Sequence, residues 1–119
     1  MDLAPALERG VAVVAAGPLE LDEVLGLLAH KAAISLQLNE RDLHEALRLR
    51  ERVRPTALPE GVALPHAILN QIPRTLVVPA VVSNGVVFDP SLPPATVIIS
   101  LFGNLARPWD HIKMLARVA

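Results

Sequence analysis

Two runs rich in β-branched residues, 75–82 and 96–102, constrain the fold more than any other feature of the chain. Such runs predict strands, and 96–102 is the most strand-like stretch present. Pro79 lies inside the first run and predicts an edge position or a bulge, because proline cannot donate to a strand ladder. The turn signal at 83–85 predicts that the chain folds back into a short strand at 86–88. A proline-rich loop is expected at 89–94.

The first half of the chain carries a different pattern. The apolar run 11–16 is flanked by glycines and predicts a buried strand. Apolar residues at helical spacing predict an amphipathic helix over 19–34. Asn39 is the expected N-cap of a second helix, which Pro55 ends. A short strand is expected at 62–64, and Pro108 is expected to begin a last helix.

This order of elements predicts one α/β domain, spanning residues 1–119, with a mixed sheet of four to five strands. The composition is 52% apolar and 19% charged, which is typical of a globular chain with a rich core. The net charge of −1 and an aromatic content of 3% give no support for nucleic-acid binding. The absence of cysteine excludes disulfides and thiolate chemistry.

The chain shows no sign of export or membrane insertion. Asp2 follows Met1, no basic segment precedes an apolar one, and the apolar runs are too short to span a bilayer. We therefore expect a cytoplasmic protein, although a domain beside a membrane protein fits the same pattern.

The four histidines differ in their surroundings. His30 and His44 lie within the predicted helices among charged neighbours, where a surface histidine is the ordinary interpretation. Their spacing matches no metal-binding motif, so neither a metal nor another cofactor is expected. His66 is different, because Pro65 precedes it at the end of a short apolar strand, where α/β folds place ligands. Hydrogen bonding of His66 to a loop carbonyl is the alternative interpretation.

Polar side chains precede His66. Arg50, Arg52 and Arg54 lie at the end of the second predicted helix, and Thr56 adds a hydroxyl. An imidazole that accepts a phosphoryl group needs one neutral nitrogen, an acceptor that fixes the other nitrogen, and donors for the phosphoryl oxygens. Arginine suits the last task through its forked donors. A solvated cation that interacts with the helix dipole is the alternative for each arginine.

The segment Arg50-Glu51, Thr56 and Gly61-Val62-Ala63-Leu64-Pro65-His66 resembles the active-site segment of enzyme IIA domains of the phosphotransferase system. The resemblance is to the fructose/mannitol type, which includes nitrogen-regulatory IIA proteins. It implies that His66 carries the phosphoryl group, that Arg50 helps to hold it, and that Thr56 is a second contact. A residue that only shapes the turn is the alternative for Thr56. His111 matches a second family histidine near the first. A partly buried helix histidine is the alternative for His111.

The resemblance also implies partners. The phosphoryl group would come from the phosphocarrier protein HPr or a relative and pass to a IIB domain. The alternative function is a regulatory or interaction module that keeps the fold and acts by binding a regulated transporter or kinase. The turn at 57–60 departs from the family's glycine-rich pattern, and Glu60 there would repel a phosphoryl group unless it points away.

The resemblance further implies a three-layer α/β/α-like domain, and the chain is C-terminally short relative to the family. We therefore expect one sheet face to be incompletely covered. Leu76, Val78, Ile98 and the neighbours of Ser100 are the expected exposed apolar surface. Patches of this kind commonly mark interfaces, which predicts a homodimer.

Overall fold

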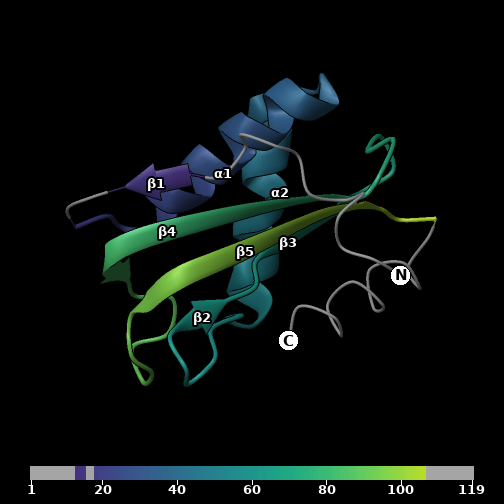
Figure 1. Ribbon diagram of the computed structural model, residues 1–119. Coiled ribbons are helices and arrows are strands. Elements are labelled where there is room, and N and C mark those ends of the chain that lie inside the picture. The colour runs from purple at the N-terminus through teal and green to yellow at the C-terminus, as the bar shows by residue number, and fades with distance from the viewer. Residues whose placement is uncertain (1–12, 16–17, 107–119) are drawn as a thin grey trace.

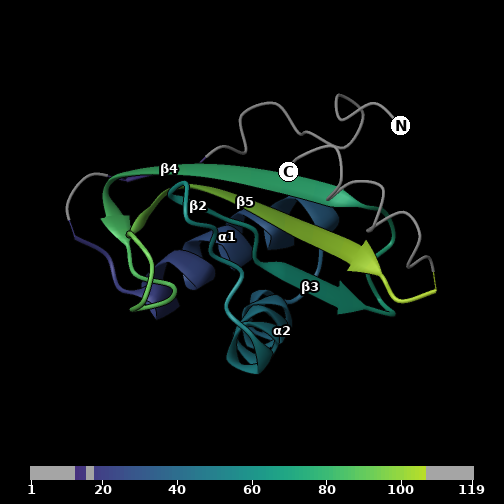
Figure 2. The same ribbon diagram turned by 90° about the horizontal axis from the view of Figure 1, so that it is seen from below.

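Residues 13–15 and 18–106 are described by the structure, a computed structural model of the 119-residue chain. Two helices, α1 (Leu21–Leu36) and α2 (Glu40–Val53), lie on the same face of a five-stranded sheet. Figure 1 shows the order of the elements, and Figure 2 shows the helices beneath the sheet. The predicted α/β class with a mixed sheet is confirmed. The last predicted helix, from Pro108 onward, lies outside the described residues.

The sheet consists of β1 (Val13–Ala15), β2 (Val62–Ala63), β3 (His66–Leu69), β4 (Leu76–Val86) and β5 (Ala95–Asn104). Its order is β1-β4-β5-β2, and β3 also pairs with β5. The long strands β4 and β5 are antiparallel, whereas β1 runs parallel to β4, and β2 and β3 run parallel to β5. The sheet is therefore built around one long hairpin, with short parallel strands added at both sides.

Strands β2 and β3 behave as one interrupted strand along β5. Ala63 is opposite Ile98, and His66 is opposite Leu101, so the register is the same on both sides of the interruption. The interruption falls at Leu64-Pro65, where the Pro65 carbonyl still accepts a hydrogen bond from the Leu101 amide at 2.9 Å. Proline has no amide hydrogen for the ladder, which explains why regular pairing stops immediately before His66.

Two predictions for the hairpin are wrong. β4 lies between β1 and β5 rather than at an edge, and Pro79 pairs with Ile99 within a continuous ladder. The irregularity occurs later, between Val81 and Val86. The turn signal at 83–85 does not reverse the chain, because β4 continues to Val86 and the reversal takes place in the loop 87–94. Gly85 has a φ of 78° and forms part of this bulge.

Local capping fixes the ends of both helices. Asn39 accepts a hydrogen bond from the Asp42 amide at 3.2 Å, which confirms it as the N-cap of α2. Glu20 and Glu23 form a reciprocal capping box at the start of α1. Helix α2 ends at Val53, two residues before Pro55, as the proline predicts. The end of α2 matters most, because it delivers the chain to His66.

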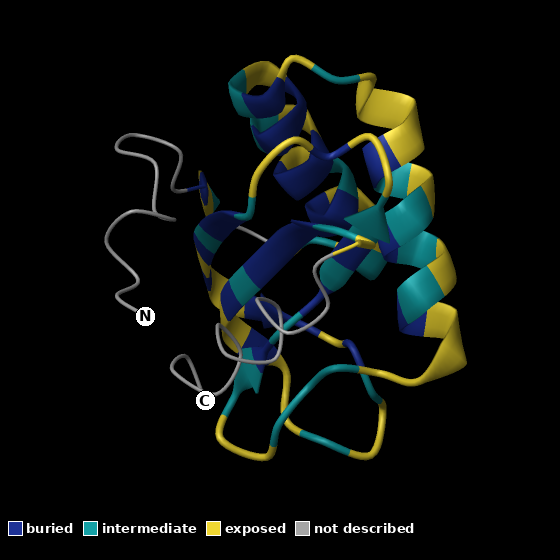
Figure 3. Cartoon of the chain, turned by 90° about the vertical axis from the view of Figure 1, so that its right-hand side faces the viewer, coloured by how far each residue is buried: buried dark blue, intermediate teal, exposed yellow. Residues whose placement is uncertain are grey.

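The core lies between the helices and the sheet, where the buried residues are coloured dark blue in Figure 3. Leu76, Val78 and Ile98 are each 0% exposed, and of the neighbours of Ser100, Leu101 is 2% exposed and Ile99 is half-buried. The prediction that Leu76, Val78 and Ile98 form an exposed patch is wrong, because alternation along the strands turns them toward the helices. The Ser100 hydroxyl donates to the Val78 carbonyl at 2.7 Å, which satisfies a polar group within the core.

Exposed apolar residues occur at the alternate strand positions instead. Val14 is opposite Val81, and Val81 is opposite Val97, so the three valines form one row across β1, β4 and β5. Their exposed fractions are 79%, 49% and 38%.

The homodimer expected from the sequence stays a prediction. The row of Val14, Val81 and Val97 is the surface through which we expect the two copies to pack. A molar mass near 12.8 kDa by light scattering at high concentration would rule the dimer out.

Gly85 and Gly61 form a matched pair for testing the fold. Both have positive φ, 78° and 81°, so an alanine at either position costs about 1–2 kcal/mol of stability. At Gly85 the added methyl would also lie 2.7 Å from Cβ of Pro94, whereas at Gly61 the nearest atom is 3.6 Å away. We expect Gly85→Ala to cost about 1–3 kcal/mol more than Gly61→Ala in urea unfolding. Equal losses would contradict the close approach of the loop to β4.

Candidate phosphoryl-transfer site

His66 begins β3, and both ring nitrogens have defined partners. Nδ1 lies 3.1 Å from the carbonyl oxygen of Leu64, and Nε2 accepts a hydrogen bond from Nε of Arg50 at 2.9 Å. A carbonyl oxygen only accepts, so Nδ1 carries the hydrogen. Arg50 only donates, so Nε2 presents its lone pair. The contacts therefore favour the neutral Nδ1–H tautomer, with Nε2 as the basic nitrogen.

Arg50 reaches His66 from the last turn of α2. Its side chain is partly buried, and Nη1 donates to the carbonyl oxygen of Arg54 at 2.8 Å. This second bond uses one of the carbonyls left without a helical partner at the end of α2. Two fixed contacts hold the guanidinium in one orientation, so that a permanent positive charge lies beside Nε2 of His66.

Glu51 is the buried charged residue next to Arg50, with 6% of its surface exposed. One carboxylate oxygen accepts from the Thr56 amide at 2.6 Å, and the other accepts from the Thr56 hydroxyl at 2.9 Å. Burial raises the pKa of the Glu51 carboxyl above its ordinary value, although the Thr56 hydrogen bonds and the charge of Arg50 oppose this. The carboxylate anchors the chain immediately after Pro55.

The turn after Thr56 closes back onto the strand that leads to His66. The Leu58 amide donates to the Val62 carbonyl at 2.7 Å, and the Leu64 amide donates to the Thr56 carbonyl at 3.3 Å. Glu60 is exposed at the tip of this turn and does not line the pocket beside His66. The acidic substitution in the turn therefore lies away from the imidazole.

A pocket of about 350 Å³ opens beside His66. Its wall combines the end of α2, the turn that follows, and the residue before Pro65. Arg50 supplies positive charge in this wall, and such a combination suits a small anion held against the imidazole. The residues that line the pocket are Arg50, Arg54, Pro55, Thr56, Ala57, Leu58, Leu64 and His66.

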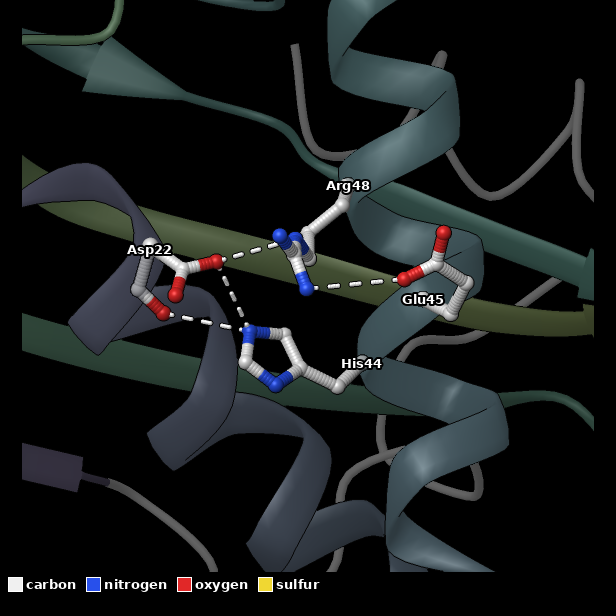
Figure 4. Close-up of polar contacts among 4 residues, drawn as sticks. All are labelled: Asp22, His44, Glu45 and Arg48. Carbon is white, nitrogen blue, oxygen red and sulfur yellow. Dashed lines mark hydrogen bonds and ion pairs between the residues drawn. The ribbon is translucent and has the colours of Figure 1, made fainter.

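His44 belongs to a separate polar cluster between the two helices, drawn in Figure 4. Its Nε2 lies 3.1 Å from Oδ1 of Asp22 and 3.2 Å from the Asp22 carbonyl. Nε of Arg48 lies 3.1 Å from the same Asp22 oxygen, and Arg48 also contacts Glu45 at 3.5 Å. His30 pairs with Glu40 at 2.7 Å. The contacts of Asp22 with His44 and Arg48, and of His30 with Glu40, join α1 to α2. Neither histidine lines the pocket beside His66.

The structure thus brings together three of the four site residues expected from the sequence, namely His66, Arg50 and Thr56. His111 lies outside the described residues. Thr56 lines the pocket, but its hydroxyl is directed to Glu51. Sequence reasoning gave no role to Glu51, although a signal was available: Glu51 follows Leu47 at helical spacing and occupies an apolar position of the buried face.

No group of three or more potential ligands among His, Cys, Asp and Glu is arranged to hold a metal ion in the described part of the chain. Within residues 13–15 and 18–106, no helix has the length and apolar character needed to cross a membrane.

The chain matches a known protein family over most of its length. Residues 19–119 match the family model for the phosphoenolpyruvate-dependent sugar phosphotransferase system, EIIA 2. The chain belongs to this family. The enzyme IIA domain is also similar to the nitrogen regulatory protein of Bradyrhizobium diazoefficiens, with 33% identity over 98 residues. The alignment spans 82% of this chain and 64% of that relative's length.

Solved structures of IIA proteins share the fold. The nitrogen regulatory protein IIA-Ntr from Neisseria meningitidis matches with a TM-score of 0.87 and 20% identity, over 97% of this chain and 80% of that one. The mannitol enzyme IIA of Escherichia coli, in complex with phosphorylated mannitol enzyme IIB, matches with a TM-score of 0.75 and 18% identity. That match covers 93% of this chain and 81% of the other. The IIA fold expected from the sequence is confirmed.

Thr56→Val tests whether the Thr56 hydroxyl serves mainly to hold the Glu51 carboxylate. Valine keeps a similar shape but removes one of the two hydrogen bonds, so we expect a loss of about 1–2 kcal/mol in unfolding free energy. The loss should depend on pH, because the missing bond lets the pKa of the Glu51 carboxyl rise further.

The direction of this pH dependence follows from the coupling between folding and the protonation of Glu51. A carboxyl whose pKa is raised on folding favours the folded state below its ordinary value of 4.5, and this contribution is lost as the pH rises through the folded-state pKa. The deficit of Thr56→Val should therefore grow as the pH rises through that range. Thr56→Ser keeps the hydroxyl and is the control. Identical denaturant curves for the two variants at every pH would refute this role.

Proposed function

We propose that this IIA domain is a phosphohistidine carrier of the phosphotransferase system and that His66 accepts the phosphoryl group on Nε2. The observation that carries the proposal is the pair of ring contacts: Nδ1 faces the Leu64 carbonyl, and Nε2 accepts from Arg50. An imidazole held in this way is a neutral nucleophile with a known reactive atom. Nε2 faces the pocket wall that carries the arginine charge.

The proposed transfer needs no cofactor, because the bond made at the His66 imidazole replaces the bond broken at the donor imidazole. The Nε2 lone pair of His66 attacks the phosphorus of a donor phosphohistidine, the new N–P bond forms, and the donor nitrogen takes back its bonding pair. The His66 ring becomes a phosphorylated imidazolium that keeps its Nδ1 hydrogen. The Leu64 carbonyl, 3.1 Å from Nδ1, stabilises that hydrogen and the ring charge.

Arg50 has two successive tasks in this scheme. Before transfer, Nε donates to Nε2 and keeps the ring oriented. When phosphorus approaches Nε2, this bond must break, and the same donor becomes available to a phosphoryl oxygen. Stabilising the transferred group electrostatically is the main contribution that a protein makes to phosphoryl transfer. Thr56 contributes through the wall of the pocket, and His111 remains the proposed second histidine of the site.

The proposed donor is HPr or a similar phosphocarrier, and the proposed acceptor is a IIB domain. The fold shared with a mannitol enzyme IIA bound to phosphorylated enzyme IIB supports the second partner. A regulatory outcome is the second candidate, favoured by the 33% identity to a nitrogen regulatory protein. In that case the phosphorylation state of His66 would control binding to a regulated transporter or kinase.

Phosphorylation can be tested directly. Incubation with phosphoenolpyruvate, enzyme I and HPr should give one acid-labile phosphoryl group per chain, with a phosphorus chemical shift typical of Nε2-phosphohistidine. His66→Ala should abolish it. Arg50→Lys keeps the charge but loses the Nε donor, so we expect the rate of phosphorylation to fall by about 10²-fold.

His30→Gln is the matched control, because His30 is exposed and pairs with Glu40 away from the pocket. It should be labelled like the wild type. Absence of label on the wild type, or equal labelling of His66→Ala, would refute the carrier function. A partner that binds wild type and His66→Ala equally well would then support a module that acts by binding alone.

A further inference from the structure

The two ring contacts of His66 within the described residues lead back to the same three residues, 54–56. On the Nε2 side, Arg50 is held by the carbonyl of Arg54 at 2.8 Å. On the Nδ1 side, the Leu64 carbonyl belongs to a residue whose amide donates to the Thr56 carbonyl at 3.3 Å. The position of segment 54–56 therefore affects the placement of both hydrogen-bond partners of the ring.

Segment 54–56 has left the helix and has lost helical hydrogen bonding. Arg54 is extended, with φ of −164° and ψ of 128°, and Pro55 has no amide hydrogen. The amide of Thr56 donates instead to the Glu51 carboxylate, at 2.6 Å, and the Thr56 hydroxyl donates to the other carboxylate oxygen. Glu51 thus provides a two-point anchor for the segment that carries the partners of His66.

Stability alone does not explain a carboxylate at position 51. Leu43, Leu47 and Glu51 share one buried face of α2, and burying a charged group costs free energy even when it is hydrogen-bonded. Burial raises the pKa of the Glu51 carboxyl, which is the signature of that cost. An apolar residue would avoid the cost but would leave the Thr56 amide without its acceptor.

We propose that Glu51 is the positioning residue of the site: by anchoring Thr56 it fixes segment 54–56, and through Arg50 and Leu64 it keeps His66 in the Nδ1–H tautomer. The effect is mechanical, because the contacts fix the positions of side chains and backbone groups and no proton moves along them. Its consequence for phosphorylation on Nε2 rests on the proposed function, whereas its consequence for the ring itself does not.

Loss of the anchor has a defined effect on the imidazole. In water the neutral ring exchanges between its two tautomers, and only specific contacts select one. Glu51→Gln keeps the length of the side chain, but its amide group presents hydrogens to one of the two Thr56 donors. Segment 54–56 should then shift, the Leu64 carbonyl should lose its alignment with Nδ1, and the Nε2–H tautomer should become populated.

The experiment is proton–nitrogen correlation NMR of the imidazole of His66 in the uniformly labelled, unphosphorylated protein. We expect the wild type to show the Nδ1–H pattern and Glu51→Gln to show a mixture that includes Nε2–H. Glu45→Gln is the matched control, since Glu45 is an exposed glutamate on the same helix that contacts Arg48, and it should retain the wild-type pattern. Thr56→Val removes one arm of the anchor and should shift the ring in the same direction, but less.

The rate of phosphorylation gives a second readout. Misplacing the nucleophile should lower the turnover of Glu51→Gln roughly tenfold or more while the KM for phospho-HPr stays close to that of the wild type. A purely structural role would change the unfolding free energy and leave the tautomer and the turnover of the folded fraction unchanged. Folded Glu51→Gln with the wild-type tautomer would overturn the proposal; if this variant does not fold, an unchanged tautomer in Thr56→Val would do so.

The outcomes also separate this proposal from the carrier function. A tautomer shift in Glu51→Gln, combined with a wild type that takes no label, would support the positioning role and refute the carrier. A labelled wild type with an unshifted Glu51→Gln ring would leave the carrier function in place and refute the positioning role.

Discussion

The pair of hydrogen bonds from Thr56 to the buried Glu51 carboxylate is the contact on which the site depends. It forms where helix α2 ends, a place where backbone groups ordinarily lack helical partners. One helix end therefore supplies three things: the carboxylate anchor, the guanidinium of Arg50, and the start of the turn that returns to Leu64. Because these groups lie within residues 50–56, their geometry relative to one another is largely local and needs little support from distant parts of the fold.

The sheet contributes the other half of the site through the interruption at Leu64-Pro65. The register between β5 and the broken strand is unchanged across this interruption, so His66 has a defined place in the sheet opposite Leu101. At the same time, the Leu64 carbonyl accepts from the ring, while the Pro65 carbonyl keeps its hydrogen bond to the Leu101 amide of β5. A nucleophile at this position combines the rigidity of a sheet with a backbone acceptor for its own Nδ1 hydrogen.

Much of this arrangement could be predicted from the sequence, because local signals agreed with the fold. The predictions of Asn39 as N-cap, of a helix end before Pro55 and of a strand near 96–102 are confirmed. Two predictions for the long hairpin formed by β4 and β5 are wrong. At Pro79 the local preference for an edge position is overridden by pairing with Ile99 of β5, and at residues 83–85 the turn signal is accommodated as a bulge between the pairs formed by Val81 and Val86. The role of Glu51 could not be predicted in the same way. Helical spacing indicates that position 51 is buried, but it does not identify Thr56, which lies beyond the end of the helix, as the hydrogen-bond partner.

The position of α2 on the sheet decides whether Arg50, at the end of the helix, contacts His66, at the start of β3. The ion pairs that join α1 to α2 involve partly exposed groups and contribute about 0–1 kcal/mol each, so they cannot set the position of the helix alone. Leu43 and Leu47 are 0% exposed and lie on the same face as Glu51. A change of one residue in the rotation of α2 would turn this face, and the carboxylate with it, by about 100°. The packing that buries the leucines is therefore the same packing that turns Glu51 inward and brings Arg50 to His66, so the local anchor at the end of α2 meets the strand residue because of the apolar core.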